Sequence, residues 1–178
     1  TDLKIHKGDL IAATSGRSFW ILDDIGLLRQ FKKSIDSFTV FQPEDTYLVN
    51  AYSELNQSNP DFDGTSKYNG VNPATGAVLY YHLPDLKADE QVDLEIKDAE
   101  GKLVRRISSK RDSLYRRYDG GPRPEPLLSK NKGLNRFVWD LRHSTVPGVP
   151  GVYIESSYAG HVASPGTYSI TFRVREKQ

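Results

Sequence analysis

The stretch QVDLEIKDAEGKLVRRIS, residues 91–108, decides the fold of this chain. Its first half alternates apolar Val92, Leu94 and Ile96 with charged residues, the pattern of an antiparallel strand with one buried face. The tetrad Asp-Ala-Glu-Gly at 98–101 predicts a hairpin turn, because its glycine accepts a positive φ. Residues 102–108 then return as the partner strand. The stretch therefore predicts antiparallel β structure.

Three further strands are expected around this hairpin, at residues 77–83, 134–141 and 166–174. Two segments rich in glycine and proline, 109–132 and 144–163, separate the later strands and are expected to be loops. Several short strands with turn signals between them predict an all-β fold, an immunoglobulin-like antiparallel β-sandwich over residues 76–178.

The N-terminal region carries a second β signal in DLIAATSGRSFWILDD, residues 9–24. It predicts a hairpin with a tight turn at 14–16 and large apolar groups on both faces. We therefore expect Phe19, Trp20 and Leu22 to pack on the sandwich or on the next helix, or to bind a neighbouring chain. Residues 25–33 predict that short helix, with an aspartate before it as a favourable N-cap.

Residues 50–75 are rich in Asn, Ser, Gly and Pro and have no hydrophobic periodicity, so they are expected to be a linker. The predicted organisation is a hairpin, a helix and connecting strands over 1–49, the linker over 50–75, and the sandwich over 76–178. At 178 residues the chain is long enough for one domain with a sizeable core and a smaller appendage.

Composition excludes several classes of function. The chain has 24 basic and 23 acidic residues, so no strong field favours nucleic acid or a membrane surface. It has no cysteine, which removes disulfides, thiol nucleophiles and cysteine metal sites. No apolar run approaches the roughly 18 residues of a membrane span, so no membrane insertion is expected. Because the chain also lacks methionine, we expect it to be a fragment of a longer protein.

Metal and catalytic motifs are weak. The four histidines show no metal-site spacing to one another or to acidic residues: His6, His82, His143 and His161. Asp61 and Asp63 resemble the start of a calcium loop whose later ligands are missing, so they are only a weak calcium candidate. No nucleophile elbow and no carboxylate pair can be nominated. We therefore assign no catalytic residue, no other metal ligand and no cofactor.

Aromatic residues in the loops offer a binding alternative. A flat tyrosine ring suits the C–H face of a sugar, and loop residues are more available for binding than strand residues. The carbohydrate-binding candidates are Tyr115, Tyr118, Tyr153 and Tyr158. Partial packing of single tyrosines is the simpler interpretation of the same pattern.

Several motifs in order give the chain a family resemblance. They are GRSFWILDD at 16–24, FQP at 41–43, NPATGA at 72–77, LEIKDAEGKLVR at 94–105, GLNRFVWDLR at 133–142 and PGTY at 165–168. Together they resemble the C-terminal part of bacterial exported sortilin/BNR-repeat, glycosyl-hydrolase-like β-propeller proteins. The later motifs are also similar to the immunoglobulin-like module of the flagellar hook-capping type. The resemblance covers most of the chain.

The resemblance implies an exported parent, periplasmic or at the cell surface or extracellular, with a signal peptide upstream. Residues 1–49 would then include a remnant of the last propeller blade, and the preceding propeller would be the main partner. It implies a non-catalytic accessory module with a structural or interaction role. The alternatives are a carbohydrate-binding module, or part of a glycoside hydrolase whose catalytic residues lie upstream. Other expected partners are a glycan, a protein or a second copy bound through the hairpin.

Overall fold

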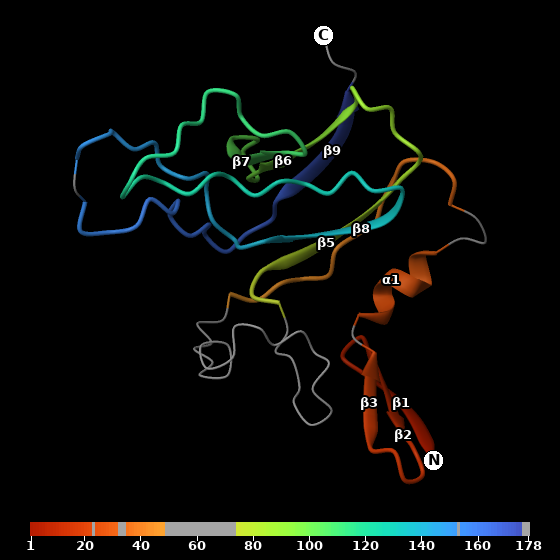
Figure 1. The fold of residues 1–178 in the computed structure, drawn as a ribbon. Helices are drawn as coiled ribbons and strands as arrows, with labels where there is room; N and C mark the ends of the chain where they lie inside the picture. The colour runs from red at the N-terminus through yellow and green to blue at the C-terminus, as the bar shows by residue number, and fades with distance from the viewer. Residues whose placement is uncertain (23, 32–34, 49–73, 153, 176–178) are drawn as a thin grey trace.

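The computed structural model of the protein describes residues 1–22, 24–31, 35–48, 74–152 and 154–175, which form nine strands and one short helix (Figure 1). The elements in chain order are β1 Asp2–His6, β2 Asp9–Ala13, β3 Phe19–Leu22, α1 Ile25–Gln30, β4 Thr39–Val40, β5 Ala77–Leu83, β6 Gln91–Lys97, β7 Leu103–Ser108, β8 Gly133–Trp139 and β9 Ser169–Arg175. Three antiparallel sheets result, in the orders β1-β2-β3, β4-β5-β8 and β7-β6-β9. The predicted all-β fold, an antiparallel sandwich preceded by a β-hairpin and one short helix, is confirmed.

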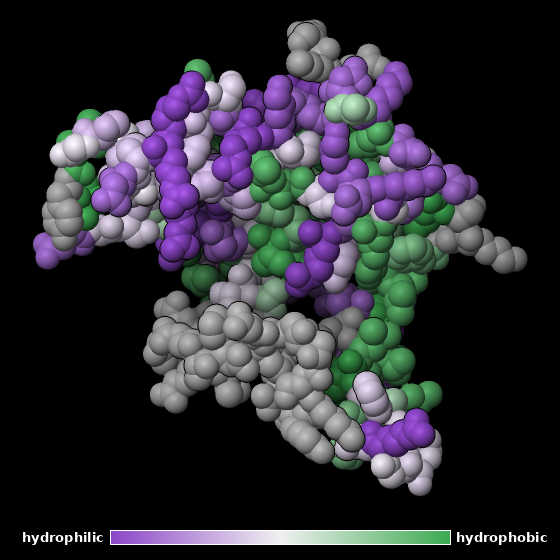
Figure 2. Space-filling view, in the orientation of Figure 1, coloured by the Kyte–Doolittle hydropathy of each residue, from purple (hydrophilic) through white to green (hydrophobic). Residues whose placement is uncertain are grey.

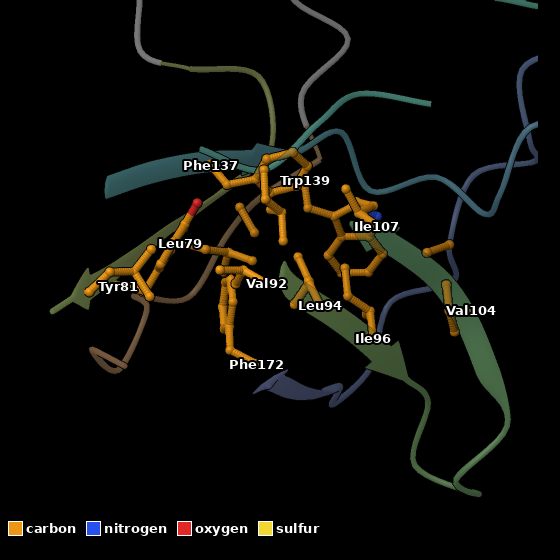
Figure 3. Packing of buried hydrophobic residues seen from close by; sticks show 14 residues of the cluster. Leu79, Tyr81, Val92, Leu94, Ile96, Val104, Ile107, Phe137, Trp139 and Phe172 are labelled. Atoms are coloured by element: carbon orange, nitrogen blue, oxygen red, sulfur yellow. The ribbon is translucent and has the colours of Figure 1, made fainter. Parts of the chain in front are cut away.

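The second and third sheets face each other and enclose the core, as Figure 3 shows. The strands predicted in this half all form, within a few residues of the expected bounds. The rings of Tyr81 from β5 and Phe172 from β9 meet across the sandwich with centroids 4.6 Å apart. The Tyr81 hydroxyl donates a hydrogen bond of 2.6 Å to the Ser129 carbonyl. Burial raises the pKa of Tyr81 to about 12, although that hydrogen bond opposes the rise, so this core tyrosine stays neutral.

The β6–β7 hairpin forms as predicted, with Gly101 at φ 80° and its N–H bonded to the Asp98 carbonyl at 3.0 Å. A register shift between Ile96 and Lys97 marks a bulge near this turn. Beyond it Arg105 pairs with Ile96, so the arginine falls on the inward face of β7, two residues before buried Ile107. The bulge therefore brings a guanidinium to the end of the core.

The outer face of the third sheet carries crossed ion pairs. Oδ2 of Asp93 lies 3.0 Å from Nε of Arg175 and 3.7 Å from Nη2 of Arg106. Arg173 and Arg175 approach Glu95 at 3.7 and 4.0 Å. This face is polar, as predicted, and its carboxylates are already paired.

The N-terminal hairpin is one strand larger than expected. β2 and β3 pair as predicted, and Gly16 in the connecting turn has φ 77°, but β1 adds a third strand on the other side of β2. Phe19, Trp20 and Leu22 remain 74%, 64% and 50% exposed. The expectation that the sandwich or the helix covers them is wrong, since the sheet lies away from the sandwich (Figure 1). Binding to a neighbouring chain stays a prediction.

Helix α1 is shorter than the predicted 25–33, and Phe31 already has extended backbone after it. Asp24 occupies the N-cap position with φ 52° and ψ 63°, and its side chain makes no capping hydrogen bond. The expected aspartate cap is therefore wrong, because a capping side chain needs an extended backbone that Asp24 does not have.

Two contacts join this region to the sandwich. The Phe31 and Phe41 rings stack at 5.2 Å, and the Gln30 side chain bonds the Gln42 backbone N–H and carbonyl at 2.7 and 3.0 Å. β4, next to these residues, pairs with β5 and so belongs to the second sheet. Residues 50–73 of the predicted linker lie outside the described residues, and the division of the chain at 49 and 75 stays a prediction.

Candidate ligand-binding cavity

The two long loops, 109–132 and 144–163, extend from the same end of the sandwich, at the left of Figure 1. Together with residues of β6 and β7 they line a cavity of about 820 Å³. A second cavity of about 740 Å³ shares part of its wall. The residues common to both are Arg111, Tyr115, Tyr118, Pro122, Arg123 and Pro124. The loop 109–132 thus places two arginines and two tyrosines between adjoining spaces.

Tyr118 is the side chain that holds the two loops together. A Cβ on Gly121 would lie 2.7 Å from the Tyr118 ring, and a Cβ on Gly148 would lie 2.2 Å from the Tyr118 hydroxyl. The same Gly148 position lies 2.8 Å from Cε1 of Tyr158. A side chain at Gly121 or Gly148 would therefore force the Tyr118 side chain or the loop to shift.

Three of the four tyrosines that the sequence nominates come together here. Burial raises the pKa of Tyr118, and the neighbouring Tyr158 and Tyr115 raise it further. The Tyr118 and Tyr158 hydroxyl oxygens are buried, and within the described chain neither makes a well-formed hydrogen bond. The Tyr115 hydroxyl donates to the Pro122 carbonyl at 3.0 Å. Tyr153, Asp61 and Asp63 lie outside the described residues, so their nominations are not placed.

A buried arginine fixes one wall of the cavity. Nη2 of Arg105 lies 2.8 Å from Oε2 of Glu125, and its Nη1 contacts the Asp140 carboxylate that follows β8. Oε1 of Glu125 accepts the Thr145 N–H at 2.7 Å. Burial alone would raise the pKa of Glu125, but the Thr145 N–H and the Arg105 guanidinium outweigh it and hold that pKa below its usual value. Glu125 therefore ties both loops to the sandwich as an anion.

Sequence reasoning did not select Arg105, Glu125 or Thr145. One signal was available: Arg105 stands two positions before Ile107, so strict alternation puts a charge on an apolar face. A charge in such a position requires a partner. The identity of that partner depends on loop geometry, which the sequence pattern does not contain.

Charges around the cavity are unequal. Its carboxylates belong to Asp93, Asp112 and Glu125, and each is engaged: Asp93 with β7 and β9 arginines, Asp112 with the Leu114 N–H at 2.8 Å, and Glu125 with Arg105. By contrast, no described carboxylate lies at ion-pair distance from the lining cations Lys110, Arg111 and Arg123. The cavity wall therefore offers unneutralised positive charge.

The histidines give a contact that the sequence spacing did not indicate. The rings of His143 and His161 stack with centroids 3.7 Å apart, held by the backbone bond from the His143 N–H to the His161 carbonyl at 2.9 Å. Burial lowers the pKa of His143, and His161 and Lys102 lower it further against the opposing Asp98. In the described part of the chain, no group of three or more His, Cys, Asp or Glu side chains is arranged to hold a metal ion.

No family model, curated protein or solved structure matches the chain. Among the described residues, no helix has the length and apolar character needed to cross a membrane.

Proposed function

We propose that the chain is a non-catalytic accessory module of an exported, glycosyl-hydrolase-like β-propeller protein, in which an immunoglobulin-like sandwich follows the propeller. The N-terminal sheet docks against the preceding propeller domain of the same parent. The motif resemblance suggests this parent, and one structural observation carries the docking role: β1–β3 have an apolar face on which Leu3, Trp20 and Leu22 are 67%, 64% and 50% exposed.

Register defines that face. One cross-strand row places Leu3, Ala12 and Trp20 side by side. The next row on the same face of the sheet consists of Ile5, Leu10 and Leu22. The intervening rows alternate to the other face and include charged Lys4 and Asp2. We call the six apolar residues of the first two rows the docking face. Figure 2 shows hydrophobic side chains over α1 and the adjoining end of this sheet, with paler and polar side chains toward the far end of the sheet.

An exposed apolar face of this kind supports a docking role on energetic grounds. No residue of β1, β2 or β3 is fully buried, so this sheet has no core of its own. Burying these apolar rows against another surface would stabilise the sheet, because apolar area removed from water contributes roughly 25 cal/mol per Å². A second sheet is a suitable partner, because packed sheets bury facing apolar rows about 10 Å apart.

Hydrogen exchange of residues 1–22 tests the docking in the full-length parent and in the 178-residue chain. We expect the amides of β1–β3 to exchange much more slowly in the parent, because docking removes local opening. The double substitution Trp20→Ser/Leu22→Ser should restore fast exchange in the parent. Leu134→Ser, which changes an exposed leucine on β8, is the matched control and should not.

Equal exchange in parent and chain would overturn the proposal. So would a parent with no β-rich domain before residue 1. Light scattering of the chain adds a third arm: a concentration-dependent dimer that protects β1–β3 would assign the face to a second copy instead.

The second candidate function is a carbohydrate-binding module, favoured by the cavity that Tyr115 and Tyr118 line. It predicts binding on a glycan array that the double substitution Tyr115→Ala/Tyr118→Ala abolishes. A role as part of a glycoside hydrolase with catalytic residues upstream rests on the resemblance alone.

A further inference from the structure

We propose that the cavity between the two loops binds an oligosaccharide that carries carboxylate groups. Arg111 and Arg123 hold the acid, and the rings of Tyr115 and Tyr118 contact the sugar. The inference rests on the carbohydrate-binding candidate above and names its ligand class. It does not depend on docking of the N-terminal sheet.

The anionic character of the ligand follows from the pairing of charges. Every carboxylate that lines the cavity is already engaged within the protein, as described above, whereas Lys110, Arg111 and Arg123 have no carboxylate partner among the described residues. An arginine guanidinium presents two parallel N–H donors that match a carboxylate, which makes it suited to recognise a planar acid. Arg116 is less available, since it donates to the carbonyls of Ser113 and Tyr115 at 2.6 and 3.1 Å.

The saccharide character follows from the tyrosines beside those arginines. Tyr115 and Tyr118 line both adjoining cavities together with Arg111 and Arg123. Their rings supply apolar surface for C–H groups. The Tyr118 hydroxyl lies against Gly148, which also lines the larger cavity. A volume of about 820 Å³ falls within the range of about 300–1,000 Å³ typical of ligand pockets.

The wall is also held in place before any ligand arrives. Glu125 links Arg105 of β7 to the Thr145 N–H of the second loop, and Tyr118 is packed against Gly121 and Gly148. A fixed site loses less conformational entropy on binding than a loop that must first be ordered.

Isothermal titration of the 178-residue chain with α-1,4-linked trigalacturonate tests the proposal, with neutral galactotriose as the matched ligand. We expect binding of trigalacturonate and at least about tenfold weaker binding of galactotriose, the loss that one charge-assisted contact produces. Arg111→Gln/Arg123→Gln should weaken trigalacturonate by about tenfold or more. The control Arg29→Gln/Arg136→Gln removes the same charge from exposed arginines outside the cavity and should leave its Kd within about twofold. Thermal melting verifies that each variant is folded.

Each other result overturns the inference. Absence of trigalacturonate binding, equal loss in both double variants, or equally tight binding of a hexaglutamate peptide would do so. Equal affinity for trigalacturonate and galactotriose overturns the anionic ligand but retains the carbohydrate-binding candidate, so the two failures are distinguishable. Neither bears on the hydrogen-exchange test of the N-terminal sheet.

Discussion

Nη2 of Arg105 lies 2.8 Å from Oε2 of Glu125, and this ion pair joins the inward face of β7 to the loop that walls the cavity. The Arg105 side chain is only 7% exposed, whereas the Glu125 side chain is 33% exposed. Removing the Glu125 carboxylate therefore leaves the more buried Arg105 guanidinium with Asp140 as its remaining carboxylate partner. The first prediction follows from this difference in burial between Arg105 and Glu125.

Glu125→Gln should lower the free energy of unfolding by about 1–3 kcal/mol, the usual cost of leaving a buried charged group short of one partner. Urea denaturation at pH 7 measures the loss. Asp119→Asn, an exposed loop carboxylate, is the matched control and should change stability by less than about 0.5 kcal/mol. Equal stability of Glu125→Gln and the unsubstituted 178-residue chain would contradict the role given to the Arg105–Glu125 ion pair.

The same variant gives a pH dependence of known sign. Because the pKa of Glu125 in the folded state lies below its usual 4.5, its contribution is fully present above that pH and is lost as pH falls through the folded-state pKa. The difference in unfolding free energy between the unsubstituted 178-residue chain and Glu125→Gln should therefore shrink on acidification from about pH 5. A difference that grows toward acid would contradict this assignment.

Gly76→Ala should be one of the most damaging single substitutions in the sandwich. Gly76 has φ 137°, and a Cβ there would lie 2.1 Å from the Trp139 carbonyl oxygen. That oxygen is a backbone atom of β8, which pairs with β5, so it cannot shift as a flexible side chain would. We expect a loss of roughly 3 kcal/mol or more, from strain and from displacement of the strand. Chemical denaturation measures the loss, or circular dichroism where the variant does not fold.

Substitutions at two other glycines distinguish the cost of a positive φ from the cost of the clash with the Trp139 carbonyl. Gly101→Ala keeps a positive φ of 80° but meets nothing within 4 Å, so it should cost only about 1–2 kcal/mol. Gly166→Ala has open space and no such backbone constraint, and should be close to neutral. Similar losses at all three positions would show that contact with Trp139 is not the cause at Gly76.

The strands of the sandwich were predictable because apolar and polar residues alternate along them. Alternation in 91–98 and a turn glycine at 101 are local features, and tertiary packing supports them. Helix α1 was harder, since its predicted last turn competes with the stacking of Phe31 on Phe41, where the backbone is extended. Strand β1 was missed because five residues with two apolar positions give too short a pattern.

The candidate site was only partly predictable for a different reason. Tyr115, Tyr118 and Tyr158 could be nominated as loop aromatics, but the sequence says nothing of the fold-back that sets Tyr118 between Gly121 and Gly148. The stacking of His143 on His161 likewise accompanies an isolated bridge between Arg142 and Val162, which lie far apart in the sequence. Long-range contacts between irregular segments have no periodic signature.

That histidine contact should make stability fall as pH drops below about 6.5. The pKa of His143 is lowered in the folded state by burial, then by His161 and Lys102, so the unfolded chain takes up the proton first. Stability is present above the usual pKa of about 6.5 and is lost as pH falls toward the folded-state value. Unfolding curves between pH 7.5 and 5 should have a component that His143→Gln removes.

The matched control for His143 is His6→Gln, which replaces an exposed histidine on β1 outside the sandwich. It should leave that component in place. If His6→Gln and His143→Gln have the same effect on the pH profile, the stacked pair is not its source.

Asp24→Gly should stabilise the chain, although it removes a residue at a helix N-cap. Asp24 has φ 52°, a left-handed conformation that costs an aspartate about 1 kcal/mol and glycine almost nothing. Its Oδ1 is buried with no hydrogen-bond partner among the described residues, and a Cβ on Gly26 would lie 3.1 Å from that oxygen and 2.6 Å from Oε1 of Glu44. Two carboxylates therefore flank Gly26. The Asp24 N–H, which donates to Oδ1 of Asp9 at 3.0 Å, is retained in the variant.

We expect Asp24→Gly to raise the free energy of unfolding by about 0.5–1 kcal/mol, measured by thermal and urea unfolding. Asp24→Asn separates the causes, because it removes the charge and tolerates the left-handed backbone. A loss of stability in both variants would contradict the prediction and show that the Asp24 carboxylate stabilises the fold.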